Sequence, residues 1–205
     1  MGASWIDWIM ELQSIAQAGL FYSKDIYDRE RFERVRELSA EMMGKVSDLP
    51  VETVRGLFCN ETGYQTPKLD TRAAIFQGGE ILLVREKSTG TWSLPGGWVD
   101  VGESVRSNTI KEVREEAGLE VEPVRLIAVQ DRDRHNRPRY AYGICKVFVL
   151  CRAISGSFAP NAETSESDFF ALGDLPELAT EKNTFEQIRM CFEAHENDDW
   201  VVLFD

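Results

Sequence analysis

The chain has 205 residues, of which 43% are hydrophobic, so a buried core is expected in one domain with a sizeable appendage. Its formal net charge is −12, from 35 acidic and 23 basic residues, and such a chain is repelled by nucleic-acid backbones and anionic membranes. None of the four cysteines forms a C-x-x-C pair, which argues against a zinc or redox motif and fits a reducing cytoplasm. No apolar run approaches the length of a membrane span, so a small anion held through a metal is the better class of partner.

Residues 1–58 are predicted to form three amphipathic helices. The first begins at a capping box of Ser4 and Asp7, and Gly19 is expected to end it. The second covers residues 25–43 with Gly44 as its stop, and the third begins at Pro50. The side chains expected to face a core are Trp5, Trp8, Ile9, Leu12, Ile15, Ala16, Phe32, Val35, Leu38, Met42, Val51, Val54, Leu57 and Phe58. Three short helices make a marginal core alone, so we expect them to pack on the rest of this chain or on a second copy.

Residues 59–67 contain Gly63 and Pro67 and are predicted to form a linker. From residue 68 to residue 205 the pattern changes to strands with interspersed helices, which predicts an α/β or α+β domain. Expected strands cover residues 72–76, 81–84, 121–130, 140–151 and 169–170, with a hairpin at Gly78-Gly79, a charged exposed loop over residues 131–139, and a final helix over residues 184–195 that turns Phe185, Ile188, Cys191 and Phe192 inward.

The residues with the strongest chemical meaning are three glutamates of one predicted helix. At about 100° per residue, Glu112, Glu115 and Glu116 fall within one sector, and apolar residues lie on the opposite side. Like charges at this spacing repel one another and destabilise the helix, and a bound hard cation removes that repulsion. Mg²⁺ and Mn²⁺ prefer carboxylate oxygens and are often shared with substrate phosphates. A bound cation that bridges a diphosphate is therefore the expected occupant, although an arbitrary cluster of this kind is usually a solvated helix face.

A glycine-rich loop precedes this helix and shifts the balance toward function. Pro95-Gly96-Gly97 brings backbone without side chains close to the same region, where its carbonyls and amides can contact a metal or a phosphate. Glu103 follows Gly97 at a fixed distance, and Gly118 is expected to end the helix in a left-handed conformation.

These spacings resemble the Nudix box over the 23 positions from Gly97 to Leu119, with Lys111 where the family pattern has Arg. The resemblance implies a Nudix fold, a mixed β-sheet sandwiched between helices. It also implies Mg²⁺ or Mn²⁺ and hydrolysis of a nucleoside diphosphate linked to a moiety X. Glu112, Glu115 and Glu116 would be metal ligands or water-activating groups, and Gly97 or its neighbour would add a backbone contact.

Further roles follow from the same resemblance. Glu103 would support the box, and Lys111 would take the place of the arginine that holds the carboxylates, with the same charge but without the planar fork. Some relatives use a glutamate on a later loop as a base or extra ligand. Glu163 and Glu166 stand where such a residue is expected, and of the two we favour Glu166; either can also be an ordinary exposed acid.

The chain outside the box resembles one bacterial Nudix subgroup that acts on ADP-ribose or CDP-choline. The similar stretches are residues 18–25, residues 60–68 and the loop at residues 131–138. This likeness implies a homodimer in which the helical segment helps to form the interface.

Substrate contacts are expected from donors that bind ribose and phosphate, and from an aromatic side chain beside the glycine loop. The candidates are Arg132, Arg134, His135, Asn136, Arg137 and Trp98, although for each loop residue a place in a solvated turn is an equal alternative. Two other functions stay open: hydrolysis of nucleoside triphosphates, and a Nudix sensor that binds a nucleotide without cleaving it. The box carboxylates, which a sensor usually loses, are all present.

Overall fold

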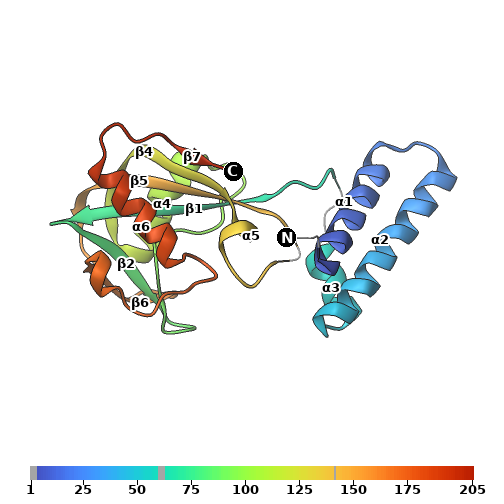
Figure 1. Ribbon diagram of the computed structural model, residues 1–205, viewed down its shortest axis with the longest axis horizontal. Helices are drawn as coiled ribbons and strands as arrows, with labels where there is room; N and C mark the ends of the chain where they lie inside the picture. Colours follow the sequence, from blue (N-terminus) through green and yellow to red (C-terminus); the bar gives the residue numbers. More distant parts are fainter. Residues whose placement is uncertain (1–3, 60–62, 141) are drawn as a thin grey trace. The chain divides into compact units, whose positions relative to one another are not determined.

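The computed structural model describes residues 4–59, 63–140 and 142–205. The chain divides into two compact units (Figure 1). One takes in the residues up to Pro67 together with the short segment around Tyr140, and the other takes in Lys68–Arg139 and Gly143–Asp205. The boundary at Pro67 coincides with the end of the expected linker, of which residues 60–62 lie outside the described residues.

The helical unit consists of α1 (Trp5–Tyr22), α2 (Ile26–Ser47) and α3 (Val51–Phe58). The predicted capping box is confirmed, because Ser4 and Asp7 exchange side-chain and backbone hydrogen bonds at the start of α1. Pro50 precedes the first residue of α3, also as predicted.

The prediction that two glycines end helices is wrong, since α1 continues past Gly19 and α2 continues past Gly44. Both glycines serve close packing instead. A Cβ atom on Gly19 would lie 2.4 Å from the Phe32 ring of α2, and one on Gly44 would lie 3.2 Å from the Leu49 carbonyl oxygen. Periodicity in sequence does not separate a helix stop from a glycine that lets two helices approach.

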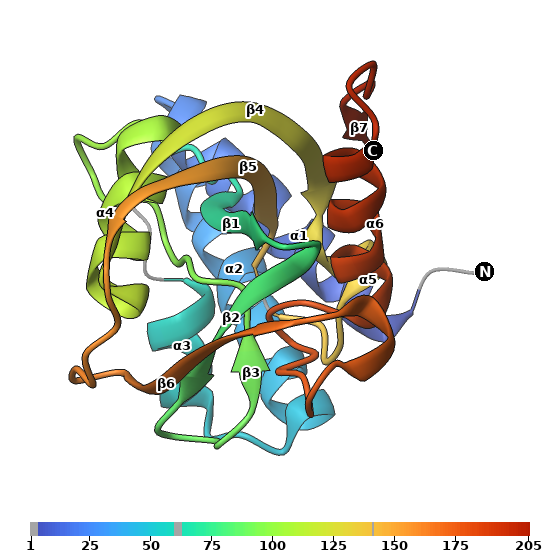
Figure 2. The same cartoon turned by 90° about the vertical axis from the view of Figure 1, so that its left-hand side faces the viewer.

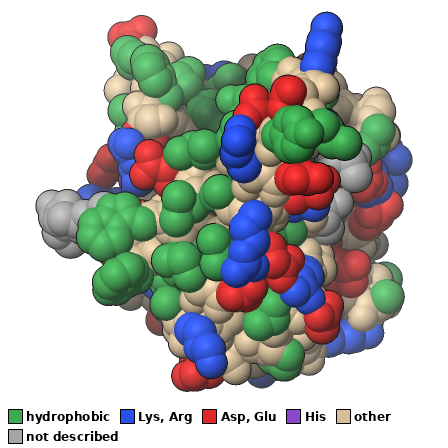
Figure 3. Space-filling model, turned by 90° about the vertical axis from the view of Figure 1, so that its right-hand side faces the viewer, with side chains coloured by type: hydrophobic (Ala, Val, Ile, Leu, Met, Phe, Trp, Pro, Cys, Tyr) green, Lys and Arg blue, Asp and Glu red, His purple; other side chains and the backbone are tan. Residues whose placement is uncertain are grey.

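The apolar stripe of α1 divides between two faces. Ile9, Ala16 and Leu20 are buried, but two glutamines share this inner face. The remaining large side chains of the stripe stay exposed in this structure: Trp5, Trp8, Leu12 and Ile15, at 64%, 46%, 38% and 53%. Figure 3 shows exposed hydrophobic side chains on one face of the molecule, interspersed with charged side chains. We call the four exposed α1 side chains the α1 apolar face.

The second unit is built on a seven-stranded mixed sheet in the order β3-β2-β1-β5-β4-β7, with β6 paired to β2. The strands are β1 (Lys68–Gln77), β2 (Glu80–Glu86), β3 (Trp92–Ser93), β4 (Leu119–Asp131), β5 (Ile144–Gly156), β6 (Thr164–Phe170) and β7 (Leu203–Phe204). β1 runs parallel to β5, whereas β1 and β2 form the predicted antiparallel hairpin. Its turn needs glycine, because Gly78 and Gly79 have φ of 60° and 83°.

Helices cover both faces of this sheet (Figure 2). Alternate residues of each strand point to opposite faces, so Ala73 and Ile75 pack with α4 (Val105–Ala117), whereas Ala74 packs with α6 (Phe185–Glu196). The expected mixed sheet between helices is therefore confirmed, and the core lies in two layers.

The main differences from the predicted elements lie between β4 and β5. A short helix, α5 (Arg132–His135), replaces the expected exposed loop, and β5 begins at Ile144 rather than at residue 140. In α6, Ile188, Cys191 and Phe192 are buried as predicted, but Phe185 is 47% exposed because it is the first residue after the N-cap. None of the helices in the described ranges is both long and apolar enough to cross a bilayer.

Candidate active site

The three glutamates of the predicted site lie on α4, whose ends are set by its own sequence. Ser104 caps the first turn through a reciprocal pair of hydrogen bonds with Ser107. Gly118 ends the helix as predicted, in a left-handed conformation with φ of 67°. Val113 and Ala117 pack on the sheet, so the face that carries Glu112, Glu115 and Glu116 turns away from the core layer.

The glycine loop between β3 and α4 lies directly against this face. The Gly96 amide donates a 2.8 Å hydrogen bond to Oε2 of Glu116. A Cβ atom on Gly97 would lie 2.8 Å from Oε2 of Glu112, so the bare backbone is what allows the approach. The loop is held to β1 by backbone bonds, one of them from the Thr71 amide to the Gly97 carbonyl at 2.9 Å.

Burial sets the charge state of these carboxylates. Glu116 is only 8% exposed, and loss of solvation raises the pKa of its carboxyl to about 7, against the opposing effects of Arg72 and the Gly96 amide. Burial likewise raises the pKa of Glu112 above its ordinary value, although the adjacent Lys111 charge acts in the opposite direction. Glu115 lies mostly in solvent. Two of the three carboxylates are therefore short of compensating positive charge.

Lys111 supplies part of that compensation. Its Nζ lies 2.8 Å from Asp100, 3.2 Å from Glu112 and 3.5 Å from Glu115. These contacts raise the pKa of the lysine, chiefly through Asp100 and Glu112. A lysine thus reaches several carboxylates here without the planar fork of an arginine.

A cavity of about 450 Å³ opens beside Glu116. Its walls come from the end of β2 and the turn after it (residues 86–88), from residues 162–164 at the start of β6, and from Lys182. The start of β6 is joined to α4 because the Glu116 carbonyl accepts hydrogen bonds from Thr164 Oγ1 at 2.7 Å and Asn161 Nδ2 at 3.2 Å. Glu163 and Glu116 therefore line the same cavity.

Glu166, the other acid expected to act here, has a different surrounding. It lies opposite Arg85 in the β2–β6 ladder, and their side chains form a 2.9 Å ion pair. Both side chains are more than 40% exposed. The sequence pattern could not separate the two glutamates, because that requires knowing where β6 begins.

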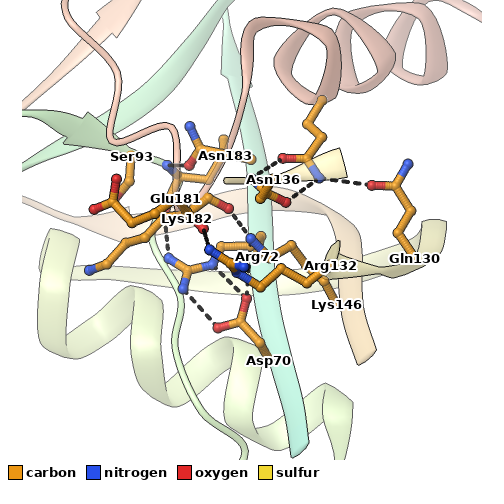
Figure 4. Close-up of polar contacts among 12 residues, drawn as sticks. Asp70, Arg72, Ser93, Gln130, Arg132, Asn136, Lys146, Glu181, Lys182 and Asn183 are labelled. Atoms are coloured by element: carbon orange, nitrogen blue, oxygen red, sulfur yellow. Dashed lines mark hydrogen bonds and ion pairs between the residues drawn. The ribbon is translucent and has the colours of Figure 1, made fainter. Parts of the chain in front are cut away.

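Two of the predicted substrate contacts are buried in a polar network (Figure 4). Arg132 is 1% exposed and donates to the Pro138 and Glu181 carbonyls. Asn136 is fully buried and donates to the Thr180 carbonyl at 2.8 Å. Their placement differs from the expected exposed loop, because both side chains donate to backbone carbonyls of the turn before α6.

The other predicted contacts stay near the surface. Arg134 lies mostly in solvent, His135 pairs with Asp205, and Arg137 donates to the Asp133 carbonyl at 2.6 Å. Trp98 is 45% exposed, and its backbone pairs with that of Asp70 in an isolated antiparallel β-bridge. Glu103 is exposed and directly precedes the Ser104 cap of α4.

Comparison with known proteins decides the family. The family model for the NUDIX domain matches residues 66–190. The chain belongs to the Nudix family. It is therefore a Nudix hydrolase, as the sequence predicts. A second family model, described as a UDP-X-like N-terminal oligomerisation domain, matches residues 3–58.

Individual relatives extend the likeness over nearly the whole chain. A putative ADP-ribose pyrophosphatase of Bacillus subtilis is 42% identical, covering 98% of this chain and 97% of the relative. A solved structure of a UDP-X diphosphatase has a TM-score of 0.65 at 34% identity and covers 97% of both chains. The structure of an ADP-ribose pyrophosphatase from Streptococcus suis is 55% identical, with a TM-score of 0.64, and covers 68% of this chain and 100% of that one.

Two residues of this Nudix site were missed in the sequence. Glu86 and Lys182 face the cavity and form a 2.7 Å ion pair, although they are 96 positions apart in the sequence. Glu86 ends a buried strand and Lys182 lies in a turn, and neither belongs to a recognisable motif. The one available indication was that Glu86 is a charged residue at the end of a strand with a buried apolar run.

Proposed function

We propose that this Nudix hydrolase cleaves the diphosphate bond of a nucleoside-diphosphate-X substrate of the ADP-ribose or CDP-choline type. The products would be a nucleoside monophosphate and X-phosphate. The observation that carries the proposal is the close approach of Gly96 to the buried Glu116 carboxylate and of Gly97 to the partly buried Glu112 carboxylate, with Glu116 also lining a cavity. The names of the relatives, ADP-ribose pyrophosphatase and UDP-X diphosphatase, support the substrate class.

A divalent cation, Mg²⁺ or Mn²⁺, fits the chemistry of this donor set. No group of three acidic, histidine or cysteine side chains in the described part of the chain is already arranged as a metal site. Mg²⁺ does not need three protein ligands arranged in advance, because it keeps several waters and is commonly held by one or two carboxylates together with substrate phosphates. Burial of Glu112 and Glu116 without enough positive charge is the feature that a cation would relieve.

Glu112, Glu115 and Glu116, with a backbone carbonyl of Gly97 or its neighbour, are the residues that would hold the cation. When bound, it would polarise the phosphate and lower the pKa of water. Lys111 holds Glu112 and Glu115 near each other, and the Gly96 amide holds the second oxygen of Glu116. Glu103 and Gly118 act indirectly, at the two ends of the loop and helix.

We assign the proton-accepting role to Glu163 in preference to Glu166. Its place in the cavity lining with Glu116 supports this choice, whereas Glu166 pairs with Arg85. In the proposed step, water oxygen attacks one phosphorus and the bond from that phosphorus to the bridging oxygen breaks. The proton of the water passes to Glu163, and the bridging oxygen leaves on the other phosphate.

Arg134, His135, Arg137 and Trp98 remain candidate contacts for the nucleoside or X. Arg132 and Asn136 would act through the turn that they hold rather than by direct contact.

The enzyme is also proposed to work as a homodimer that associates through the α1 apolar face. Exposed apolar patches of this kind on a helix commonly mark an interface. The match of residues 3–58 to an oligomerisation domain supports a second copy of this chain as the occupant.

The substrate is tested by phosphate release from a panel of nucleotides, with phosphatase added to convert the products. The panel includes ADP-ribose, CDP-choline, UDP-sugars, NADH, dinucleoside polyphosphates and nucleoside triphosphates, each with and without Mg²⁺. We expect metal-dependent cleavage of a diphosphate-X compound. Preference for a triphosphate would identify a triphosphate pyrophosphohydrolase, and tight binding without turnover would identify a sensor.

A further inference from the structure

Lys182 lies on the wall of the cavity beside Glu116, and its function is not explained by the Nudix box. Its Nζ lies 2.7 Å from Oε1 of Glu86, and its side chain is 34% exposed. The same Glu86 oxygen accepts a hydrogen bond from Ser93 Oγ at 3.2 Å. An ammonium group has three hydrogens, so this ion pair leaves donors that can turn toward the cavity.

The backbone around Lys182 is held by buried side-chain donors from other elements (Figure 4). The Lys182 carbonyl accepts a hydrogen bond from Nζ of Lys146, a side chain that is 2% exposed. The carbonyls of the two preceding residues accept from Arg132 and Asn136. Three buried polar side chains from other elements therefore fix the position of this one turn.

The same turn is joined to the glycine loop. Asn183, which is fully buried, accepts a 2.8 Å hydrogen bond from the Leu94 amide through its side-chain oxygen. Leu94 is two residues before Gly96, whose amide contacts Glu116. Lys182 and the carboxylate face of α4 are thus held in fixed register through a short chain of hydrogen bonds.

The excess of negative charge among the residues that line the cavity indicates a function for Lys182. Glu86, Glu116 and Glu163 contribute carboxylates to the lining, and the other lysine in it, Lys87, donates to the Asn161 carbonyl. A diphosphate that enters such a cavity needs positive charge on the side away from any cation held by α4. A lysine ammonium is well suited to a phosphate oxygen because it acts as a compact point charge.

We propose that Lys182 binds a non-bridging oxygen of the substrate diphosphate, and that the buried hydrogen bonds of its turn hold the lysine in position for this contact. This inference rests on the proposed function. It adds a substrate-binding residue from outside the Nudix box, on an element that is far from α4 in the sequence.

The test compares binding of adenosine 5′-(α,β-methylene)diphosphate, which cannot be hydrolysed between its phosphorus atoms, by calorimetry in Mg²⁺. Lys182→Met is expected to raise the Kd at least about tenfold, and Lys182→Arg is expected to restore part of the loss. Lys45→Met, the same change on an exposed lysine of α2, serves as the matched control and is expected to leave the Kd unchanged. The midpoint of thermal unfolding is recorded for each variant, because Lys182→Met leaves the buried Glu86 carboxylate without its ion-pair partner.

Glu86→Gln separates binding from a merely structural ion pair. If Lys182 contacts the diphosphate, removing a nearby negative charge tightens or preserves binding, so the two substitutions act in opposite directions. If the pair only maintains the fold, Glu86→Gln and Lys182→Met weaken binding alike, and the proposal is wrong. Equal Kd values for Lys182→Met and wild type would also overturn it.

Steady-state kinetics with ADP-ribose give a second readout. Lys182→Met is expected to raise KM more than it lowers kcat, because the contact is present before the bond breaks. A wild-type protein that neither binds the analogue nor cleaves any member of the nucleotide panel would overturn the proposed function, and the assignment of Lys182 with it. A wild-type protein that does both, with a Lys182→Met variant that matches it, would overturn the assignment of Lys182 alone.

Discussion

The Gly96 amide and the Glu116 carboxylate lie 2.8 Å apart, and this hydrogen bond joins the glycine loop to the carboxylate face of α4. The two neighbouring glycines have different tasks there. Gly96 has φ of 142°, and a Cβ atom on it would lie 1.9 Å from the Thr71 carbonyl oxygen. Gly97 would meet the Glu112 carboxylate rather than backbone.

Alanine at these two positions should therefore separate stability from activity. Gly96→Ala is expected to destabilise the fold by at least about 2 kcal/mol, since both its backbone angle and the fixed Thr71 carbonyl oppose a side chain. Gly97→Ala is expected to keep the fold and lower kcat about 10- to 100-fold by displacing Glu112. Urea unfolding and kinetics on both variants measure this, and Gly56→Ala, where a Cβ would meet nothing within 4 Å, controls for the substitution itself. A fully active Gly97→Ala enzyme would show that Glu112 is not needed where it lies.

The two later glutamates are distinguished by their surroundings. Glu163→Gln is expected to lower kcat by about 10²- to 10⁴-fold, the usual contribution of a positioned acid or base. Glu166→Gln is expected to leave kcat within a few-fold of wild type and stability within about 1 kcal/mol, because its ion pair with Arg85 is exposed. Rate measurements with saturating substrate and Mg²⁺ compare the pair. The reverse order of effects would return the role to Glu166, as the sequence alone favoured.

The buried Lys146 should make the stability of the metal-free protein depend on pH. Burial lowers its pKa to about 7 in the folded state, from an ordinary value of 10.5. Between these values the unfolded chain binds more protons, so the free energy of unfolding rises with pH by about 1.4 kcal/mol per unit. The gain in stability that comes from deprotonating Lys146 is complete above the unfolded pKa of 10.5. It is lost as the pH falls through the folded pKa of about 7. From pH 7 to pH 9 it amounts to about 2 kcal/mol.

Urea unfolding at pH 7 and pH 9 in EDTA measures this contribution as the difference between wild type and Lys146→Met. The variant should lack the extra rise, and Lys45→Met should keep it. Parallel pH profiles for wild type and Lys146→Met would mean that Lys146 stays charged in the folded protein.

The α1 apolar face is expected to hold two copies of the chain together. Light scattering should give the wild type a mass near twice the 23.3 kDa of one chain. Ile15→Glu puts a charge on this face and is expected to shift the protein to monomer. Ser14→Glu, on another exposed side of the same helix, should leave the mass unchanged. A wild type that is monomeric, or an Ile15→Glu variant with unaltered mass, would contradict this interface.

Much of the fold follows from local pattern. The apolar runs of β1 and β5, the Gly78-Gly79 turn and the caps at Ser4 and Gly118 have physical causes that are visible in the sequence. The glycines at 19 and 44 were misinterpreted because their function depends on a neighbouring helix. The sequence also could not predict which apolar side chains of α1 are buried. Only the packing of the helices shows that Gln13 and Gln17 lie on the buried face in place of the larger apolar residues.

The candidate site divides in the same way. Residues within the box are brought together by one loop and one helix, so their spacing was enough. Glu86, Lys182 and the choice of Glu163 depend on contacts between distant strands and turns, which a single sequence does not encode locally. Arg132 and Asn136 were misplaced because a polar loop residue that fills buried hydrogen bonds has the same appearance in the sequence as one that meets solvent.

The most direct test of the account is the turnover of the preferred substrate by Glu116→Gln at saturating Mg²⁺, with circular dichroism to show an intact fold. The glutamine keeps an oxygen to accept the Gly96 amide but loses the charge. We expect hydrolysis to fall by at least about 10³-fold, since the carboxylate is proposed to hold the cation. Turnover near the wild-type rate would contradict the claim that this face of α4 carries the chemistry.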